Sequence, residues 1–164
     1  MPDCPLSSGL SAQTLLFAQP ADFMIPLDVM SAEYQRPAPE LSKFYLRVKR
    51  NRYYMECLKT QEESIPDGDY CFVILVDVPG EVICGCATDI DGHTSLTMRA
   101  GRKGARPVYY AGHLYFDQGR LVKWDNGSGH YLPAPELYPV NVLPEVQRLL
   151  PLKRFVNKWK ALSC

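Results

Sequence analysis

The chain has 164 residues and a formal net charge of zero, with 18 basic and 18 acidic side chains. This length suits a single domain that buries a real core, and 46% hydrophobic with 22% charged residues is ordinary for a globular protein. The balanced charge argues against a dedicated nucleic-acid binder, and no apolar run approaches the length of a membrane span.

The first forty residues are rich in proline: Pro2, Pro5, Pro20, Pro26, Pro37 and Pro39. Because proline fixes φ and lacks a backbone donor, this segment cannot hold a long helix or a central strand. We therefore divide the chain into an extended arm, residues 1–40, and one globular domain, residues 41–164. The N-terminus lacks the basic and apolar regions of a secretory signal, which predicts a cytoplasmic protein or one exported by a specialised secretion system.

Alternating hydrophobic residues predict strands from Phe44 onward. Residues 44–49 and 52–58 form a β-hairpin pattern around a tight turn at Arg50-Asn51. The nearly continuous apolar run 70–76 suits a strand buried on both faces, and 81–87 follows as the next strand. The cysteines Cys57 and Cys71 lie in these runs, so we interpret them as small core residues. The chain has six cysteines but no C-x-x-C motif, which fits a reducing compartment.

The second half predicts a short strand at 93–98 and a hairpin formed by 107–116 and 120–124. A helical stripe then closes the chain, and packing on one sheet face is favoured for it over binding to a membrane surface; its members are Leu152, Phe155, Val156, Trp159 and Leu162. The predicted fold class is α+β: an antiparallel sheet or small, partly open barrel with a C-terminal amphipathic helix and the N-terminal arm.

All three histidines, His93, His113 and His130, fall in one window of 41 residues, from His93 to Pro133. Imidazole titrates near neutral pH and is also a common metal ligand, so this window is the expected site. His130 leaves a glycine-flanked turn, where Asp125 or Ser128 would fix its tautomer. We expect strand pairing to gather the imidazoles in a common hollow.

The catalytic candidates in this window are His130, His93 and Ser95. On a strand His93 and Ser95 would share one face, where a hydroxyl beside an imidazole acts as a nucleophile or an orienting donor. Arg106 would bind an anionic group. The remaining ligand-binding candidates are Tyr131, Ser128 and His113. The basic runs near residues 43–52 and 153–160 are interpreted as solvated surface.

Two other chemistries could use the residues of this window. Three histidines on adjacent strands would suit zinc or iron, but they lack a compact ligand spacing, so no metal and no other cofactor is assigned. A thiol of Cys84-Gly85-Cys86 paired with His130 would resemble a thiol hydrolase. Two small residues packed in a strand explain that pair more simply.

The window carries a motif pattern: His93, Ser95 and Leu96; Arg106-Pro107-Val108; Ala111-Gly112; Gly119; and Ser128-Gly129-His130-Tyr131 with Pro133. It resembles a recurring domain of bacterial toxin and effector proteins. That pattern has a serine where this chain has Thr94, and a glutamate where it has His113. The resemblance implies a toxin or effector context and leaves open whether the chain is an enzyme.

The favoured function is a small bacterial effector- or toxin-associated domain with a polar cleft lined by the candidates above and open to a small-molecule substrate. The alternative is a non-catalytic protein-binding module, such as an immunity protein or a secretion adaptor. That module would use a tyrosine-rich sheet face. A protein partner is expected, and neither nucleic acid nor a membrane span is.

Overall fold

The computed structural model describes residues 20–30, 35–102 and 104–159. Within them lies one eight-stranded sheet in the order β3-β2-β1-β5-β4-β6-β7-β8. All neighbours are antiparallel except β7 and β8. The strands are β1 (Phe44–Lys49), β2 (Arg52–Cys57), β3 (Glu63–Ser64), β4 (Gly68–Leu75), β5 (Ile83–Cys86), β6 (Val108–Asp117), β7 (Arg120–Asp125) and β8 (Phe155–Val156).

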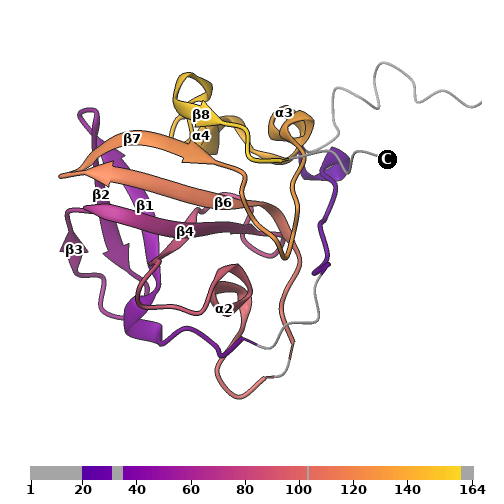
Figure 1. Cartoon of the computed structure of the whole chain (residues 1–164), viewed down its shortest axis with the longest axis horizontal. Helices are drawn as coiled ribbons and strands as arrows, with labels where there is room; N and C mark the ends of the chain where they lie inside the picture. The colour runs from indigo at the N-terminus through magenta and orange to yellow at the C-terminus, as the bar shows by residue number, and fades with distance from the viewer. Residues whose placement is uncertain (1–19, 31–34, 103, 160–164) are drawn as a thin grey trace, which may run out of the picture.

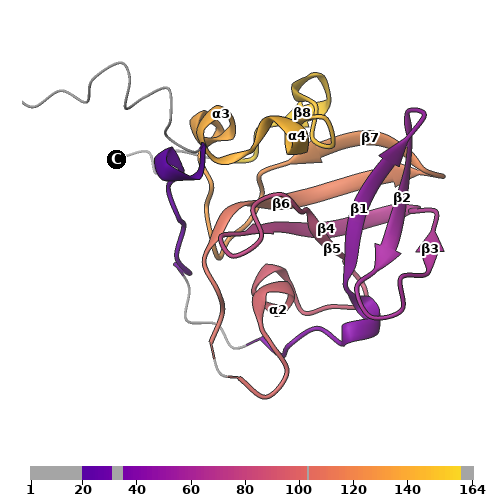
Figure 2. The ribbon, with the colours of Figure 1, turned by 180° about the vertical axis from the view of Figure 1, so that it is seen from behind.

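The helical segments are short and lie on both sides of the sheet. Figure 1 places α2 below β4 and β6, whereas α3, α4 and β8 lie above β7; Figure 2 shows the same arrangement from behind. The α-helices are α2 (His93–Thr97), α3 (Tyr138–Asn141) and α4 (Pro144–Gln147), and the 3₁₀ turns are η1 (Pro20–Phe23), η2 (Glu40–Ser42), η3 (Pro135–Leu137) and η4 (Leu152–Arg154). The predicted α+β class with its antiparallel sheet is confirmed, and α4 is a short helix in the C-terminal part of the chain.

The predicted hairpin forms as β1 and β2, with Leu46 opposite Met55. Arg50 and Asn51 occupy the turn at φ 54° and 62°, the left-handed conformation that matches the twist of a two-residue hairpin. The sheet curls enough for β2 to reach the β6–β7 turn, where the Tyr53 amide donates to the Gly119 carbonyl at 2.9 Å.

The central strand β4 contributes to both core clusters because its side chains alternate between faces. Phe72 and Ile74 pack with Trp124 in the cluster beneath α3 and α4. Cys71 and Val73 belong to the opposite cluster, which Leu96 of α2 covers. The near-continuous apolar run therefore marks a strand buried on both faces, as predicted.

Two predicted elements are wrong. Residues 93–97 form helix α2 rather than a strand, because Ser95 bonds the backbone of Gly92 and caps the helix start. The stripe from Leu152 does not form a helix within the described residues; η4 and β8 take its place, and Leu162 lies outside them. Phe155 instead packs on Trp124, with ring centroids 4.5 Å apart, and so pairs β8 with β7.

The described parts of the arm pack on the domain. Leu27 forms an isolated bridge with Val108 of β6, and the Ala38 amide donates to the Ser95 carbonyl at 3.0 Å. Met24 is buried in the larger core cluster. No helix in the described ranges has both the length and the apolar character needed to cross a membrane.

Candidate functional site

The pairing of β4 with β6 sets Cys71 directly opposite His113. Both side chains lie on the α2 side of the sheet, because each residue shares its face with neighbours of that cluster. Cys71 is only 6% exposed, whereas the His113 side chain is 31% exposed. The pair therefore spans from the core to the surface.

His93 joins this pair as the first residue of α2. Its ring centroid lies 5.0 Å from that of His113. One ligand atom each from Cys71, His93 and His113 lies within 4.8 Å of the other two. Residues from two strands and a helix thus meet in one small cluster, which we call the Cys-His-His cluster.

A buried carboxylate orients His113. Asp125 Oδ1 lies 3.0 Å from His113 Nδ1 and accepts backbone bonds from His113 and Gly127 at 3.1 and 2.9 Å. Its Oδ2 accepts the Tyr115 hydroxyl at 2.9 Å. Because a carboxylate accepts, Nδ1 of His113 carries the hydrogen, which leaves Nε2 as the nitrogen available for a proton or a metal.

The pKa shifts of His113 and Asp125 both favour the charged forms of the two side chains. The hydrogen bond to Asp125, followed by that to Cys71, raises the pKa of His113 to about 9. Burial alone would raise the pKa of Asp125, but the bonds from His113 and Gly127 outweigh burial and hold the pKa below its ordinary value. Without a metal, therefore, the pair is an imidazolium and a carboxylate at neutral pH.

His93 has the opposite character. Burial, with a smaller contribution from the neighbouring His113 charge, lowers the pKa of His93 to about 4. Its Nε2 lies 2.7 Å from the Gly112 carbonyl. Since a carbonyl accepts, the neutral ring carries its hydrogen on Nε2, and Nδ1 keeps its lone pair.

Gly112 makes this geometry possible. A Cβ at this position would lie 1.8 Å from the Asp125 carbonyl oxygen, so a residue with any side chain would push β6 away from the end of β7. The Ala-Gly step noted in the sequence thus permits a close backbone approach next to Asp125.

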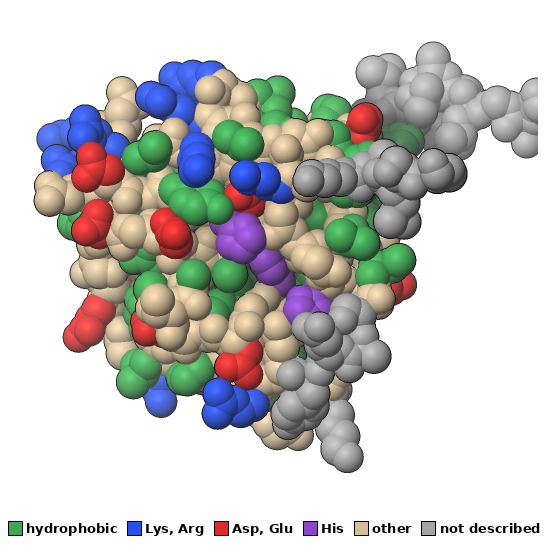
Figure 3. All heavy atoms as spheres, in the orientation of Figure 1, with side chains coloured by type: hydrophobic (Ala, Val, Ile, Leu, Met, Phe, Trp, Pro, Cys, Tyr) green, Lys and Arg blue, Asp and Glu red, His purple; other side chains and the backbone are tan. Residues whose placement is uncertain are grey.

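His130 lies near the cluster but is not one of its three ligands. It lies close enough to His93 to contribute, after burial and His113, to the lowered pKa of His93, and its carbonyl accepts the Met30 amide at 2.6 Å. Figure 3 shows the three histidine side chains in a row across one face of the molecule. His93 and His113 therefore lie side by side, although His93 comes from helix α2 rather than from a paired strand.

The other candidate residues fix loops around this row. Ser95 is fully buried, and its hydroxyl donates to the Gly92 carbonyl at 2.5 Å. Ser128 Oγ accepts the Tyr131 amide at 3.4 Å. The Tyr131 hydroxyl donates to the Arg106 carbonyl at 2.7 Å. These contacts are structural.

Arg106 is turned away from the histidines. Its Nε donates to the Thr97 carbonyl, and its guanidinium lies 3.7 Å from Asp77. It lines a separate cavity of about 320 Å³ with Arg99 and Arg102. The candidate residues therefore do not line one common cleft, because Arg106 belongs to a different cavity.

The tyrosine-rich face proposed for protein binding is largely internal. Tyr109, Tyr110, Tyr131 and Tyr138 are buried, and Tyr115 of this set is half-buried with its hydroxyl bonded to Asp125. A flat aromatic interface of these five side chains is thus absent from the described surface.

Two members of the site were missed from sequence. The core position predicted for Cys71 is confirmed, but its place opposite His113 is not predicted. Asp125, expected with Ser128 as a possible partner of His130, contacts His113 instead. The signal for Cys71 appears only once β4 is paired with β6, which are separated by β5 and α2 in the chain.

No family model, curated protein or solved structure matches this chain.

Proposed function

We propose that the chain binds one divalent transition-metal ion, with zinc the best fit, through Cys71, His93 and His113. The observation that carries this proposal is the mutual 4.8 Å approach of their ligand atoms. A thiolate and two imidazoles form a donor set that suits zinc, which is borderline-soft and prefers sulfur and nitrogen.

The orientation of both imidazoles supports the same conclusion. Metal-bound histidines characteristically donate their second ring N–H to a carboxylate or a backbone carbonyl. Here the Asp125 carboxylate accepts the ring N–H of His113, and the Gly112 carbonyl accepts the ring N–H of His93. Each of the two histidines held in this way keeps one ring nitrogen that can serve as a ligand.

Three protein ligands leave a fourth tetrahedral position, as in catalytic zinc sites. The half-exposed His113 puts this position within reach of solvent. Zinc lowers the pKa of bound water to about 7, which generates a nucleophile at neutral pH. We therefore favour a metal-assisted hydrolase, in which Cys71 and the histidines hold the ion while Asp125 orients His113.

Cobalt titration tests the proposal. Cobalt(II) added to EDTA-treated protein should bind one equivalent and produce both tetrahedral d–d bands and a thiolate charge-transfer band. Cys71→Ser should remove the charge-transfer band, and His113→Ala should weaken binding. The control is Cys86→Ser, because this thiol bonds Thr88 outside the cluster. Absence of a thiolate band in the wild type, or its loss in the control alone, would rule the site out.

A second candidate function rests on the same residues. The Cys71 thiol, the His113 imidazole and the Asp125 carboxylate contact one another in that order. This is the arrangement of a cysteine nucleophile, its base and the acid that orients the base. In this case Cys71 would react with iodoacetamide in EDTA, and His113→Asn would slow the reaction. The effect of zinc on this reaction distinguishes the two functions. Zinc bound at the site should protect the Cys71 thiolate from iodoacetamide, whereas a thiol that acts only as a nucleophile should react equally with or without zinc.

The wider role follows the sequence resemblance. We infer a toxin- or effector-associated domain whose chemistry resides in the Cys-His-His cluster rather than in Ser95 or Arg106. Expression of the chain in a bacterial host, compared with Cys71→Ser and Cys86→Ser, tests this role. Growth inhibition that depends on Cys71 but not Cys86 supports it, and inhibition by neither the wild type nor the control contradicts it.

A further inference from the structure

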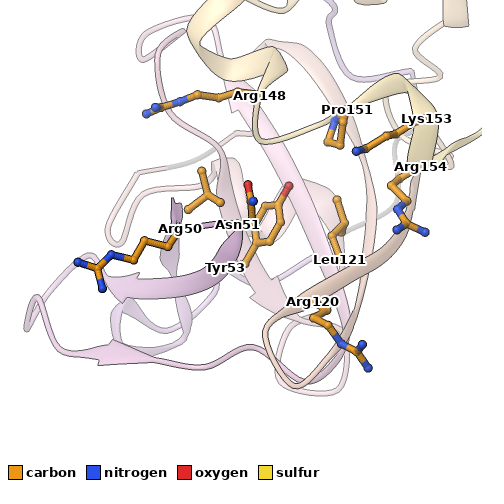
Figure 4. Close-up of a pocket in the computed structure, with 10 residues that line it drawn as sticks. Arg50, Asn51, Tyr53, Arg120, Leu121, Arg148, Pro151, Lys153 and Arg154 are labelled. Atoms are coloured by element: carbon orange, nitrogen blue, oxygen red, sulfur yellow. The ribbon is translucent and has the colours of Figure 1, made fainter.

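A cavity of about 680 Å³ opens on the face of the sheet opposite the Cys-His-His cluster. Three separate segments line it: the β1–β2 turn, the start of β7 and the stretch from 148 to 154. Figure 4 shows Tyr53 and Leu121 in the middle of this pocket, with Arg50, Arg120 and Arg148 at its rim and their guanidinium groups directed outward. We call it the basic pocket.

Basic side chains dominate the lining. Half of its ten residues carry a positive charge, and among the described residues that line it none is acidic; the five are Arg50, Arg120, Arg148, Lys153 and Arg154. The whole chain is neutral, so the positive charge gathered here must be balanced by acidic groups elsewhere. Field lines in such a concave, single-sign surface concentrate anions.

Four of these five cations lack the carboxylate partners that arginines have elsewhere in the described chain. Arg36 pairs with Asp91, and Arg47 with Glu56 and Glu81. In the described parts of the chain, Arg120 of the basic pocket pairs with Asp117 at 2.8 Å, and no ion pair forms with the other four. A pocket in which four of the five cations have no carboxylate partner among the described residues favours an external anion.

The floor of the pocket is already ordered. The Tyr53 hydroxyl donates to the Leu149 carbonyl at 3.0 Å, and its ring packs on Phe116 at 5.5 Å. Trp124 Nε1 donates to the Pro151 carbonyl at 2.8 Å. Because the backbone segments are fixed, binding an anion requires ordering of the exposed basic side chains but not of the backbone.

We propose that the basic pocket binds a small molecule carrying two or more phosphate groups. Arginine offers paired donors that match phosphate oxygens, so several arginines on separate segments suit several phosphates. The cavity volume lies within the roughly 300–1,000 Å³ typical of small-molecule sites. A nucleic acid fits less well, since the cations surround one pocket and its aromatic ring, Tyr53, is packed against the core rather than free to stack.

Calorimetric titration with inorganic tripolyphosphate tests the site in the full chain. The wild type should bind one equivalent with submillimolar affinity, and added salt should weaken binding. Arg148→Gln combined with Arg154→Gln should weaken it at least about tenfold, as the loss of charge-assisted hydrogen bonds implies. The charge-matched control is Lys59→Gln with Arg36→Gln, two exposed cations outside the pocket.

The outcomes separate cleanly. Tripolyphosphate binding that the pocket pair weakens and the control pair preserves supports the proposal. Absence of binding, or equal weakening by both pairs, overturns it. Tighter binding of a single-stranded oligonucleotide through the same arginines would replace it with a nucleic-acid site. Amide shifts of Asn51 and Leu121 in the wild type locate the bound anion independently of any variant.

Discussion

The Nδ1 atom of His113 lies 3.0 Å from the Oδ1 atom of the buried Asp125. This contact sets the tautomer of His113 and raises its pKa, whereas His93, 5.0 Å away between ring centroids, is held neutral by burial. Two adjacent imidazoles therefore differ in charge at neutral pH. A metal would remove this difference, because both rings must be neutral to coordinate it.

The first prediction concerns the orienting carboxylate. Asp125→Asn keeps the shape of the side chain but removes the charge that polarises His113, so metal affinity should fall about 10- to 100-fold. Competition with a chromogenic chelator measures this change. Asp117→Asn serves as the control, because its exposed pairing with Arg120 lies on the opposite end of the β6–β7 hairpin. Equal affinities of the two variants would show that Asp125 does not tune the site.

The second prediction concerns the pH dependence of stability in EDTA. The folded-state pKa of His113 is raised to about 9, so its contribution is complete below 6.5 and is lost as pH rises through about 9. The pKa of His93 is lowered to about 4, so the unfolded chain gains a proton that the folded chain excludes as pH falls from 6.5 to about 4. These two groups together favour maximal stability near pH 6.5.

Urea unfolding across this range checks both signs. His113→Asn should flatten the decline above pH 6.5 and leave the acid side unchanged. His93→Asn should flatten the decline below pH 6.5. A wild-type free energy of unfolding that rises between pH 6.5 and 9, with the difference from His113→Asn also rising, contradicts the assignment of His113.

The elements that depend on local sequence patterns could be predicted, whereas those set by tertiary contacts could not. Alternation gave the β1–β2 hairpin, and the apolar run gave β4. The segment at His93 was assigned to a strand because its alternating side chains fit one. The Ser95 hydroxyl instead donates to the Gly92 carbonyl and caps the start of α2, which favours a helix over a strand at this position. The helix predicted from the C-terminal stripe does not form, because Phe155 packs on Trp124. The spacing of hydrophobic residues cannot reveal such a tertiary contact.

The site could be predicted only in part. The window of histidines identified the region, because imidazoles are scarce and chemically distinctive. Cys71 could not be found, since its neighbours read as core and its partner His113 lies 42 positions along the chain. Asp125 was recognised as a possible partner of a ring nitrogen, but the choice of ring depends on how β7 pairs with β6.

The third prediction concerns the close approach at Gly112. Gly112→Ala places a Cβ 1.8 Å from the Asp125 carbonyl oxygen, so β6 and the end of β7 must separate. We expect destabilisation of about 3 kcal/mol or more, with loss of metal binding. Gly129→Ala is the matched control in the same motif region, because no atom lies within 4 Å of its added Cβ. Thermal unfolding of the two variants gives the comparison, and similar midpoints would contradict the steric account.

The fourth prediction separates Ser95 from the chemistry. Its hydroxyl donates to the Gly92 carbonyl at 2.5 Å and caps α2, while its side chain is fully buried. Ser95→Ala should therefore lower the free energy of unfolding by about 1–2 kcal/mol and leave the stoichiometry and spectrum of bound cobalt unchanged. Cobalt titration beside urea unfolding makes the distinction. A variant as stable as the wild type but unable to bind cobalt or to react at Cys71 would return Ser95 to the site, because a purely capping hydroxyl acts only through the stability of α2.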